Sequence, residues 1–129
     1  MKFLVLLGRI FYSVIFIGSG IGHFSQSAMD YAQMHGVPMA NFLVPASGLI
    51  ALLGGISILL GYKARLGALF LIIFLVPVTL MMHNFWMVTE PGVELIQRAM
   101  FMKNLALLGA ALLIFYFGSG PMSVTKYKK

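Results

Sequence analysis

Four long apolar stretches alternate with short polar connections along the chain. A membrane-crossing helix needs roughly 20 mainly apolar residues, and residues 3–24, 42–62, 66–88 and 99–117 meet this requirement. Within these stretches only Arg9 and Lys103 carry a formal charge. The pattern predicts an all-α integral membrane protein, a four-helix bundle that forms a single domain over residues 1–129.

Composition supports a lipid-embedded protein and excludes several functional classes. The chain is 60% hydrophobic and 9% charged, whereas soluble domains carry about 25% charged residues. It has no Cys, which excludes disulfides and thiolate metal sites. No His or acid pair has the compact spacing of a zinc motif, so we expect no metal. The net charge of +6 comes from basic residues near the segment ends, which indicates topology rather than nucleic-acid binding.

The distribution of Lys and Arg predicts orientation. Four spans place both termini on one side with the connection between the second and third spans, and this side holds seven of the nine basic residues. Cytoplasmic loops carry such an excess, so we expect cytoplasmic termini in a multi-pass protein of the bacterial inner membrane. The seven residues are Lys2, Arg9, Lys63, Arg65, Lys126, Lys128 and Lys129. All three His and all three acidic residues fall in the opposite, outer half.

The connections have local signals of their own. Ser27 predicts the N-cap of a short helix that Gly36 ends. We expect residues 89–98 to form the third connection, with Glu94 and Arg98 paired at i, i+4. The tail from Gly118 is predicted to be mobile and attracted to anionic lipid.

Polar residues in the first span follow one helical face. Arg9, Ser13, Phe16, Gly20 and His23 are separated by steps of four and three residues. This face should point into the bundle, although snorkelling of Arg9 and an interfacial position for His23 are alternatives. In the second span Ser47, Ala51, Gly54 and Gly61 predict a close helix-packing seam.

A second polar group lies where the third span ends and the fourth begins. His83 lies about one turn inside the membrane interface, and Glu90 follows it by seven residues. Lys103 would need a carboxylate such as Glu90, unless it snorkels. Trp86 suits an aromatic belt as well as a ring pocket, and Asn104 would bond another helix.

Several motifs resemble those of the DoxX family of small four-span bacterial membrane proteins. They are GR at 8–9 with the 16–23 segment, GVP at 36–38, GGISILLG at 54–61 with Arg65, HNFW at 83–86, FMKNLALLG at 101–109 and GSGPMS at 118–123. The resemblance implies a four-helix membrane bundle. It also implies a link with thiosulfate:quinone oxidoreductase, membrane redox complexes or oxidative-stress responses. Many relatives carry a Glu shortly before the Gly-Gly pair, where this chain has Ala51.

These observations predict a membrane subunit of a redox-associated, quinone-linked complex, an oxidoreductase subunit with no covalently bound cofactor of its own. A quinone or similar lipid-soluble ligand would bind at the outer end of the bundle. His23, His83 and Lys103 would hydrogen-bond or protonate its oxygens, because imidazole exchanges protons near neutral pH. Phe16 and Trp86 would line the ring pocket.

In this hypothesis Asn104 orients the polar group, Glu90 belongs to the same site, and Arg9 is a separate intramembrane charge. We expect the lipid bilayer, redox subunits and further copies of the chain as partners, and no nucleic acid. Two alternatives stay open: a non-enzymatic assembly or chaperone subunit, and a small transporter.

Overall fold

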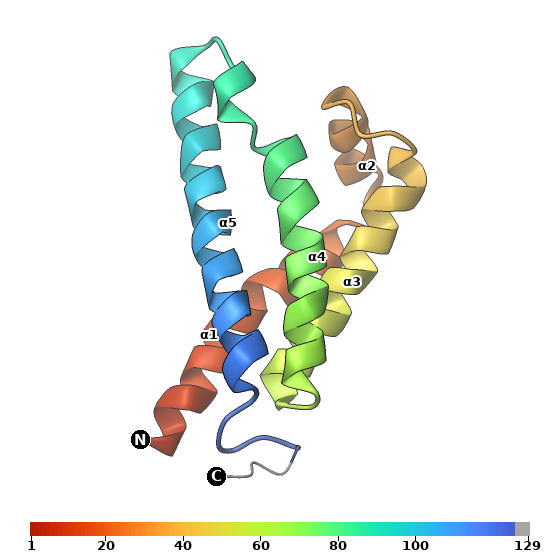
Figure 1. Ribbon diagram of the computed structural model, residues 1–129. Helices are drawn as coiled ribbons and strands as arrows, with labels where there is room; N and C mark the ends of the chain where they lie inside the picture. Colours follow the sequence, from red (N-terminus) through yellow and green to blue (C-terminus); the bar gives the residue numbers. More distant parts are fainter. Residues whose placement is uncertain (126–129) are drawn as a thin grey trace.

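The computed structural model describes residues 1–125, and its regular elements are all helical (Figure 1). Four helices are long and apolar enough to cross a membrane, which confirms the predicted architecture. They are α1 (Lys2–Gly22), α3 (Ala40–Leu60), α4 (Ala64–Met82) and α5 (Pro91–Phe117); the short elements are α2 (Gln26–Met34) and the 3-10 turn η1 (Phe85–Met87).

The two ends of the bundle differ in what they carry. Met1, the tight turn between α3 and α4, and the segment after α5 lie at one end, which we call the terminal end (Figure 1). The short helix α2 and the α4–α5 connection lie at the opposite, distal end. Which membrane side each end faces stays a prediction from charge.

The long helices pack in the order α1, α3, α4, α5, and α2 rests on α3. Glycines make two of these contacts close. A Cβ on Gly20 would lie 2.8 Å from the Gly48 carbonyl, and one on Gly54 would lie 2.9 Å from the Gly67 carbonyl. Small residues at a crossing let backbones approach in lipid, where packing replaces the hydrophobic drive. Gly54, which belongs to the seam predicted in the second span, makes the contact with α4, whereas the contact with α1 uses Gly48, which was not predicted.

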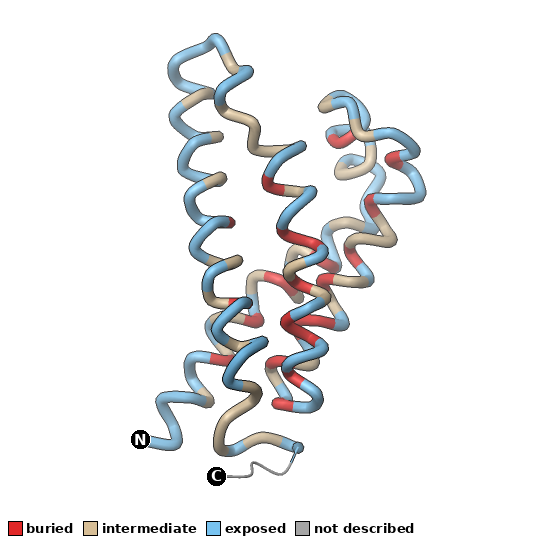
Figure 2. The backbone as a smooth tube through the Cα atoms, viewed as in Figure 1, coloured by how far each residue is buried: buried red, intermediate tan, exposed pale blue. Residues whose placement is uncertain are grey.

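The buried residues lie where α3 and α4 face their neighbours, and the upper part of α5 is largely exposed (Figure 2). The main core cluster is made of Phe16, Ala51, Ile58, Ala64, Ala68, Leu71, Phe74 and Leu75. A smaller cluster beneath α2 holds Ala32, Ala40 and Val44. The exposed Leu, Ile and Phe side chains are the surface that lipid tails would cover.

At the distal end, the third span ends close to its expected boundary, whereas the fourth begins earlier than expected. The third span covers Ala64–Met87, close to the expected residue 88. Within it, helix α4 ends at Met82, because His83 leaves the helical region with φ −125° and ψ 39°, and the turn η1 follows. Helix α5 starts at Pro91, so most of the expected 89–98 connection is helical. Proline suits a first helical turn because its missing N–H has no partner there in any case. At about 1.5 Å per residue, the 27 residues of α5 exceed the hydrocarbon thickness of about 30 Å.

Two further expectations need correction. The N-cap of α2 is Ser25 rather than Ser27, and its side chain accepts a hydrogen bond from the Ala28 N–H at 3.2 Å. The segment 118–125 was expected to be mobile, but it folds back on the end of α3. There the Val124 N–H donates to the Leu60 carbonyl at 3.0 Å. The basic residues expected to attract anionic lipid, Lys126, Lys128 and Lys129, lie outside the described residues.

Candidate functional site

The polar face of α1 points into the bundle, as its spacing predicted. The four buried residues of this helix are Arg9, Ser13, Phe16 and Gly20. His23 follows as the C-cap and is partly buried. The two ends of this face lie in different surroundings, with Arg9 at the terminal end and His23 at the distal end.

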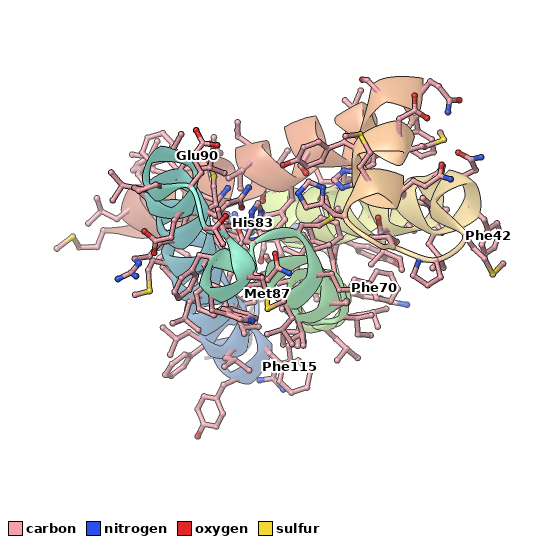
Figure 3. The ribbon with its side chains drawn as sticks, turned by 90° about the horizontal axis from the view of Figure 1, so that it is seen from above. Phe42, Phe70, His83, Met87, Glu90 and Phe115 are labelled. Atoms are coloured by element: carbon pink, nitrogen blue, oxygen red, sulfur yellow. The ribbon has the colours of Figure 1, made fainter. Side chains whose placement is uncertain are left out.

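The structure separates the other predicted ligand-binding groups instead of joining them with His23. His83 lies next to α5, where its Nδ1 is 2.8 Å from Oε1 of Gln97. Figure 3 looks down on the distal end and shows His83 and Glu90 on the side of α4 and α5, away from Phe42 on α3. Glu90 is exposed at the N-cap of α5. The shared nook expected for His23, His83 and Lys103 is therefore not formed.

Lys103 is also away from any carboxylate that could hold it. Its side chain is exposed, and its Nζ contacts the Met100 sulfur at 3.6 Å. Glu94, the other acidic residue of this region, forms the predicted pair with Arg98, at 2.6 Å. Lys103 lies 12 residues after the start of α5, so snorkelling of its ammonium stays a prediction.

Trp86 lies in an aromatic group rather than in a ring pocket. Its side chain is 55% exposed, and its ring meets those of Phe85 and Phe101 edge-on, with centroids 5.3 and 5.8 Å away. This arrangement is typical of an aromatic belt at a membrane interface. Asn104, by contrast, is 5% exposed and is one of the two buried residues of α5.

A cavity of about 400 Å³ lies between α2, α3 and α4 at the distal end, and His23 lines it. Ligand pockets typically measure about 300–1,000 Å³. Its walls are almost entirely apolar. The lining residues are His23, Ala28, Tyr31, Ala32, Val37, Leu43, Val44, Ala46, Ser47, Ile50, Ile73, Phe74, Pro77, Val78, Met81 and Met82. Of the residues predicted to bind a ligand, His23 is the one that the cavity includes.

Sequence reasoning missed this cavity because its walls come from three helices whose packing the chain does not encode locally. Some signals were present. Pro77 removes a backbone N–H that would have bonded the Ile73 carbonyl, and both residues line the cavity. Ala46 and Ser47 place small side chains on the facing part of α3. Small residues and a helix-breaking proline on facing helices leave space that larger side chains would fill.

Backbone contacts orient the His23 ring. Its Nδ1 lies within hydrogen-bond distance of the Ser19 carbonyl, which can only accept, so Nδ1 carries the proton. In the neutral ring Nε2 is then an acceptor. Nε2 has no hydrogen-bond partner among residues 1–125. The imidazole thus has one fixed nitrogen and one that is open to a ligand.

Aromatic packing also holds this ring in place. His23 meets Phe74 edge-on with centroids 5.5 Å apart, and Phe74 meets Phe16 in the same way at 6.3 Å. Phe74 forms part of the cavity wall, and Phe16 supports it from behind. Phe16 was predicted to line a ring pocket. It does not line this cavity, but packs against Phe74, which does. Within residues 1–125, no three His, Asp or Glu side chains come together in a way that could hold a metal ion.

Comparison with known proteins decides the family. The DoxX family profile matches residues 4–84, more than half of the chain. The chain belongs to the DoxX family. It is 30% identical over 122 residues to the inner membrane protein YqjF of Escherichia coli (strain K12), an alignment that covers 95% of this chain and 89% of that protein. No solved structure matches this DoxX protein. Together with its four spans, the match identifies a multi-pass protein of the inner membrane.

Proposed function

We propose that this DoxX protein binds a quinone, or a similar lipid-soluble ring compound, in the distal cavity. The observation that carries the proposal is a mostly apolar cavity of about 400 Å³ whose lining includes His23, an imidazole with one nitrogen free of protein partners. Such cavities take ligands through apolar contact, and a few polar groups fix the orientation.

The polar groups of the cavity suit both forms of a quinone couple. Neutral His23 offers Nε2 as an acceptor for a hydroquinone hydroxyl, and the protonated ring offers an N–H to a quinone carbonyl. Ser47 already donates to the Val44 carbonyl at 2.7 Å, which leaves its oxygen free to accept. His23 would therefore bind the ligand oxygen and exchange its proton.

The position of the cavity supports entry from the bilayer. Several of its lining residues are partly exposed on the membrane-facing side, among them Leu43 at 40% and Ile73 at 52%. An isoprenoid or other apolar tail would leave between α3 and α4 and lie among lipid chains. Tyr31, on the α2 roof, is 47% exposed at the rim.

The redox part of the proposal rests on the family resemblance and on charge. Lys2, Arg9, Lys63 and Arg65 belong to the terminal end, and three more Lys follow residue 125 in the sequence. This charge favours a cytoplasmic position for the termini and an outer position for the cavity. The chain has no Cys, so electrons would reach the ligand from partner subunits. The DoxX protein would hold the ligand and handle its proton within such a complex.

Quinone binding by the purified protein tests the proposal, measured as ubiquinone retained after delipidation and as affinity for a short-chain quinone. We expect His23→Ala to weaken binding about three- to tenfold, which corresponds to one lost hydrogen bond. His83→Ala is the matched control, because His83 bonds Gln97 outside the cavity. Equal losses in the two variants, or no loss in either, would overturn the site.

A second pair of variants tests the cavity itself. Ala46→Phe would fill part of it and should reduce binding more than His23→Ala does. Ala106→Phe adds the same ring to an exposed position of α5 and should leave binding unchanged. Binding that survives Ala46→Phe in a folded protein would place the ligand elsewhere.

One observation favours the assembly alternative. In the most apolar stretch of α5, 11% of the residues are buried, whereas the share is 33% in the third span and in α3. A helix so little covered by its own chain offers a long apolar side to another membrane protein. Crosslinking through a single Cys introduced at Leu113, which is 61% exposed, would test it: a crosslinked neighbour that persists in Ala46→Phe would support an assembly role independent of ligand.

A further inference from the structure

A buried cation lies at the terminal end, opposite the cavity. Arg9 is 5% exposed, and its guanidinium lies between the C-terminal turn of α3 and the segment after α5. One nitrogen, Nη2, donates to the Met122 carbonyl. A Cβ on Gly61 would collide with the neighbouring Nη1, so a glycine at this point makes room for the charge.

Most of the hydrogen-bonding capacity of this group is unused. Nε and Nη1 of Arg9 are buried and have no partner among the described residues. The same is true of the Ser13 hydroxyl, one turn further along the same face of α1, in a residue that is 0% exposed. Buried donors without partners, above all charged ones, are costly. Three nitrogens of Arg9 and the Ser13 hydroxyl are therefore four donor atoms on one face, and the Met122 carbonyl is the one acceptor that they have among the described residues.

No acidic side chain can neutralise Arg9. The three acidic residues, Asp30, Glu90 and Glu94, belong to α2 and to the start of α5, both at the distal end. A charge beside the covering segment has the same sign as Arg9. Nε of Arg65 lies 3.4 Å from where a Cβ on Gly118 would be, at the start of the segment that covers Arg9. Residues 1–125 therefore supply no counter-charge for Arg9.

A short segment, residues 118–125, covers the guanidinium of Arg9, and we call it the strap. Residues 118–125 run without a helix across the end of α3. The Val124 and Thr125 N–H groups donate to the Leu60 and Gly61 carbonyls at 3.0 and 3.2 Å. The Lys63 N–H donates to the Thr125 hydroxyl at 3.1 Å. Few hydrogen bonds hold the strap, so it can lift while the four long helices stay packed.

We propose that Arg9 and Ser13 form an anion site beneath this strap and that it takes a phosphate group when the strap lifts. Guanidinium pairs with phosphate through charge-assisted hydrogen bonds, and its Nε and Nη1, which lie on opposite edges of the group, are both free for them here. The hydroxyl of Ser13 adds a third donor. The phosphate comes either from an anionic lipid headgroup of the same leaflet or from free phosphate. The site is at the opposite end from the proposed quinone cavity and does not depend on it.

Binding is tested on the full chain, delipidated in a neutral detergent, with two probes: phosphatidylglycerol, counted by native mass spectrometry, and inorganic phosphate, followed by thermal shift. We expect Arg9→Gln to lower occupancy at least tenfold and Arg9→Lys to lower it severalfold, since an ammonium lacks the planar fork. Arg65→Gln is the matched control, a surface cation at the same end that should change occupancy less than twofold. Should Arg9→Gln fail to fold, Ser13→Ala serves instead and should lower occupancy severalfold.

The outcomes separate the sources of the phosphate. Retention of phosphatidylglycerol with no phosphate shift assigns the site to a lipid headgroup, and the reverse assigns it to free phosphate. Binding of neither probe, or equal losses in Arg9→Gln and Arg65→Gln, overturns the site. Hydrogen exchange at the Val124 and Thr125 amides should accelerate on binding; a bound phosphate with these amides still protected overturns the role of the strap.

Discussion

The crossing of α1 and α3 gives the sharpest test of how this protein is packed, through Gly48→Ala. A Cβ on Gly48 would lie 2.7 Å from the Gly20 carbonyl and 2.6 Å from the Cβ of His23. Ordinary contacts begin near 3.4 Å, so the two helices would have to separate by roughly 0.7 Å (3.4 − 2.7). The obstacle on one side is backbone, which cannot rotate away as a flexible side chain can.

The expected cost follows from two opposing terms. Overpacking typically destabilises by about 1–3 kcal/mol, and replacing a helical Gly by Ala returns about 0.5–1 kcal/mol. The difference between these ranges is a net loss of about 0–2.5 kcal/mol, and its midpoint of about 1.3 kcal/mol corresponds to a melting temperature lower by about 3–7 °C for a chain of this size. Because His23 would move as well, quinone affinity should fall in the same variant.

This effect is measured as the melting temperature of Gly48→Ala in detergent. Gly18→Ala, measured in the same detergent, is the control. Gly18 is inside α1, about one turn before its end, and no neighbouring atom lies within 4 Å of its would-be Cβ, so its replacement should leave stability unchanged or slightly higher. Equal melting temperatures for the two variants would show that the α1–α3 crossing is looser than described. The account of how His23 is positioned would then fail with it.

Two further predictions concern single hydrogen bonds. Tyr12→Phe removes the donor to the Leu107 carbonyl, at 2.8 Å, and should cost about 0.5–1.5 kcal/mol in thermal unfolding, because this bond joins α1 to α5; an unchanged melting temperature would contradict it. Ser25→Ala removes the N-cap of α2 and should cost about 0.5–2 kcal/mol of local stability. Faster hydrogen exchange in α2 would reveal it, and Ser27→Ala should have the smaller effect.

The candidate site was only partly predictable. The inward face of α1 followed from spacing alone, because a polar residue in a span is stable only when it faces protein. The grouping of His23 with His83 and Lys103 did not follow. All three lie in the distal half, but α4 stops at Met82 and turns His83 towards Gln97. A helical wheel extended past the true helix end assigns a side chain to the wrong face.

The sequence by itself determined the number of spans, the family and the inward face of α1. These depend on apolar length and on a period of 3.6 residues, both of which are local properties that lipid enforces on any chain. The tertiary structure decided which helices touch, where a cavity remains, and what covers Arg9. Those features depend on which glycines meet at a crossing and on how far facing helices diverge, and each is settled by residues that are distant in the chain.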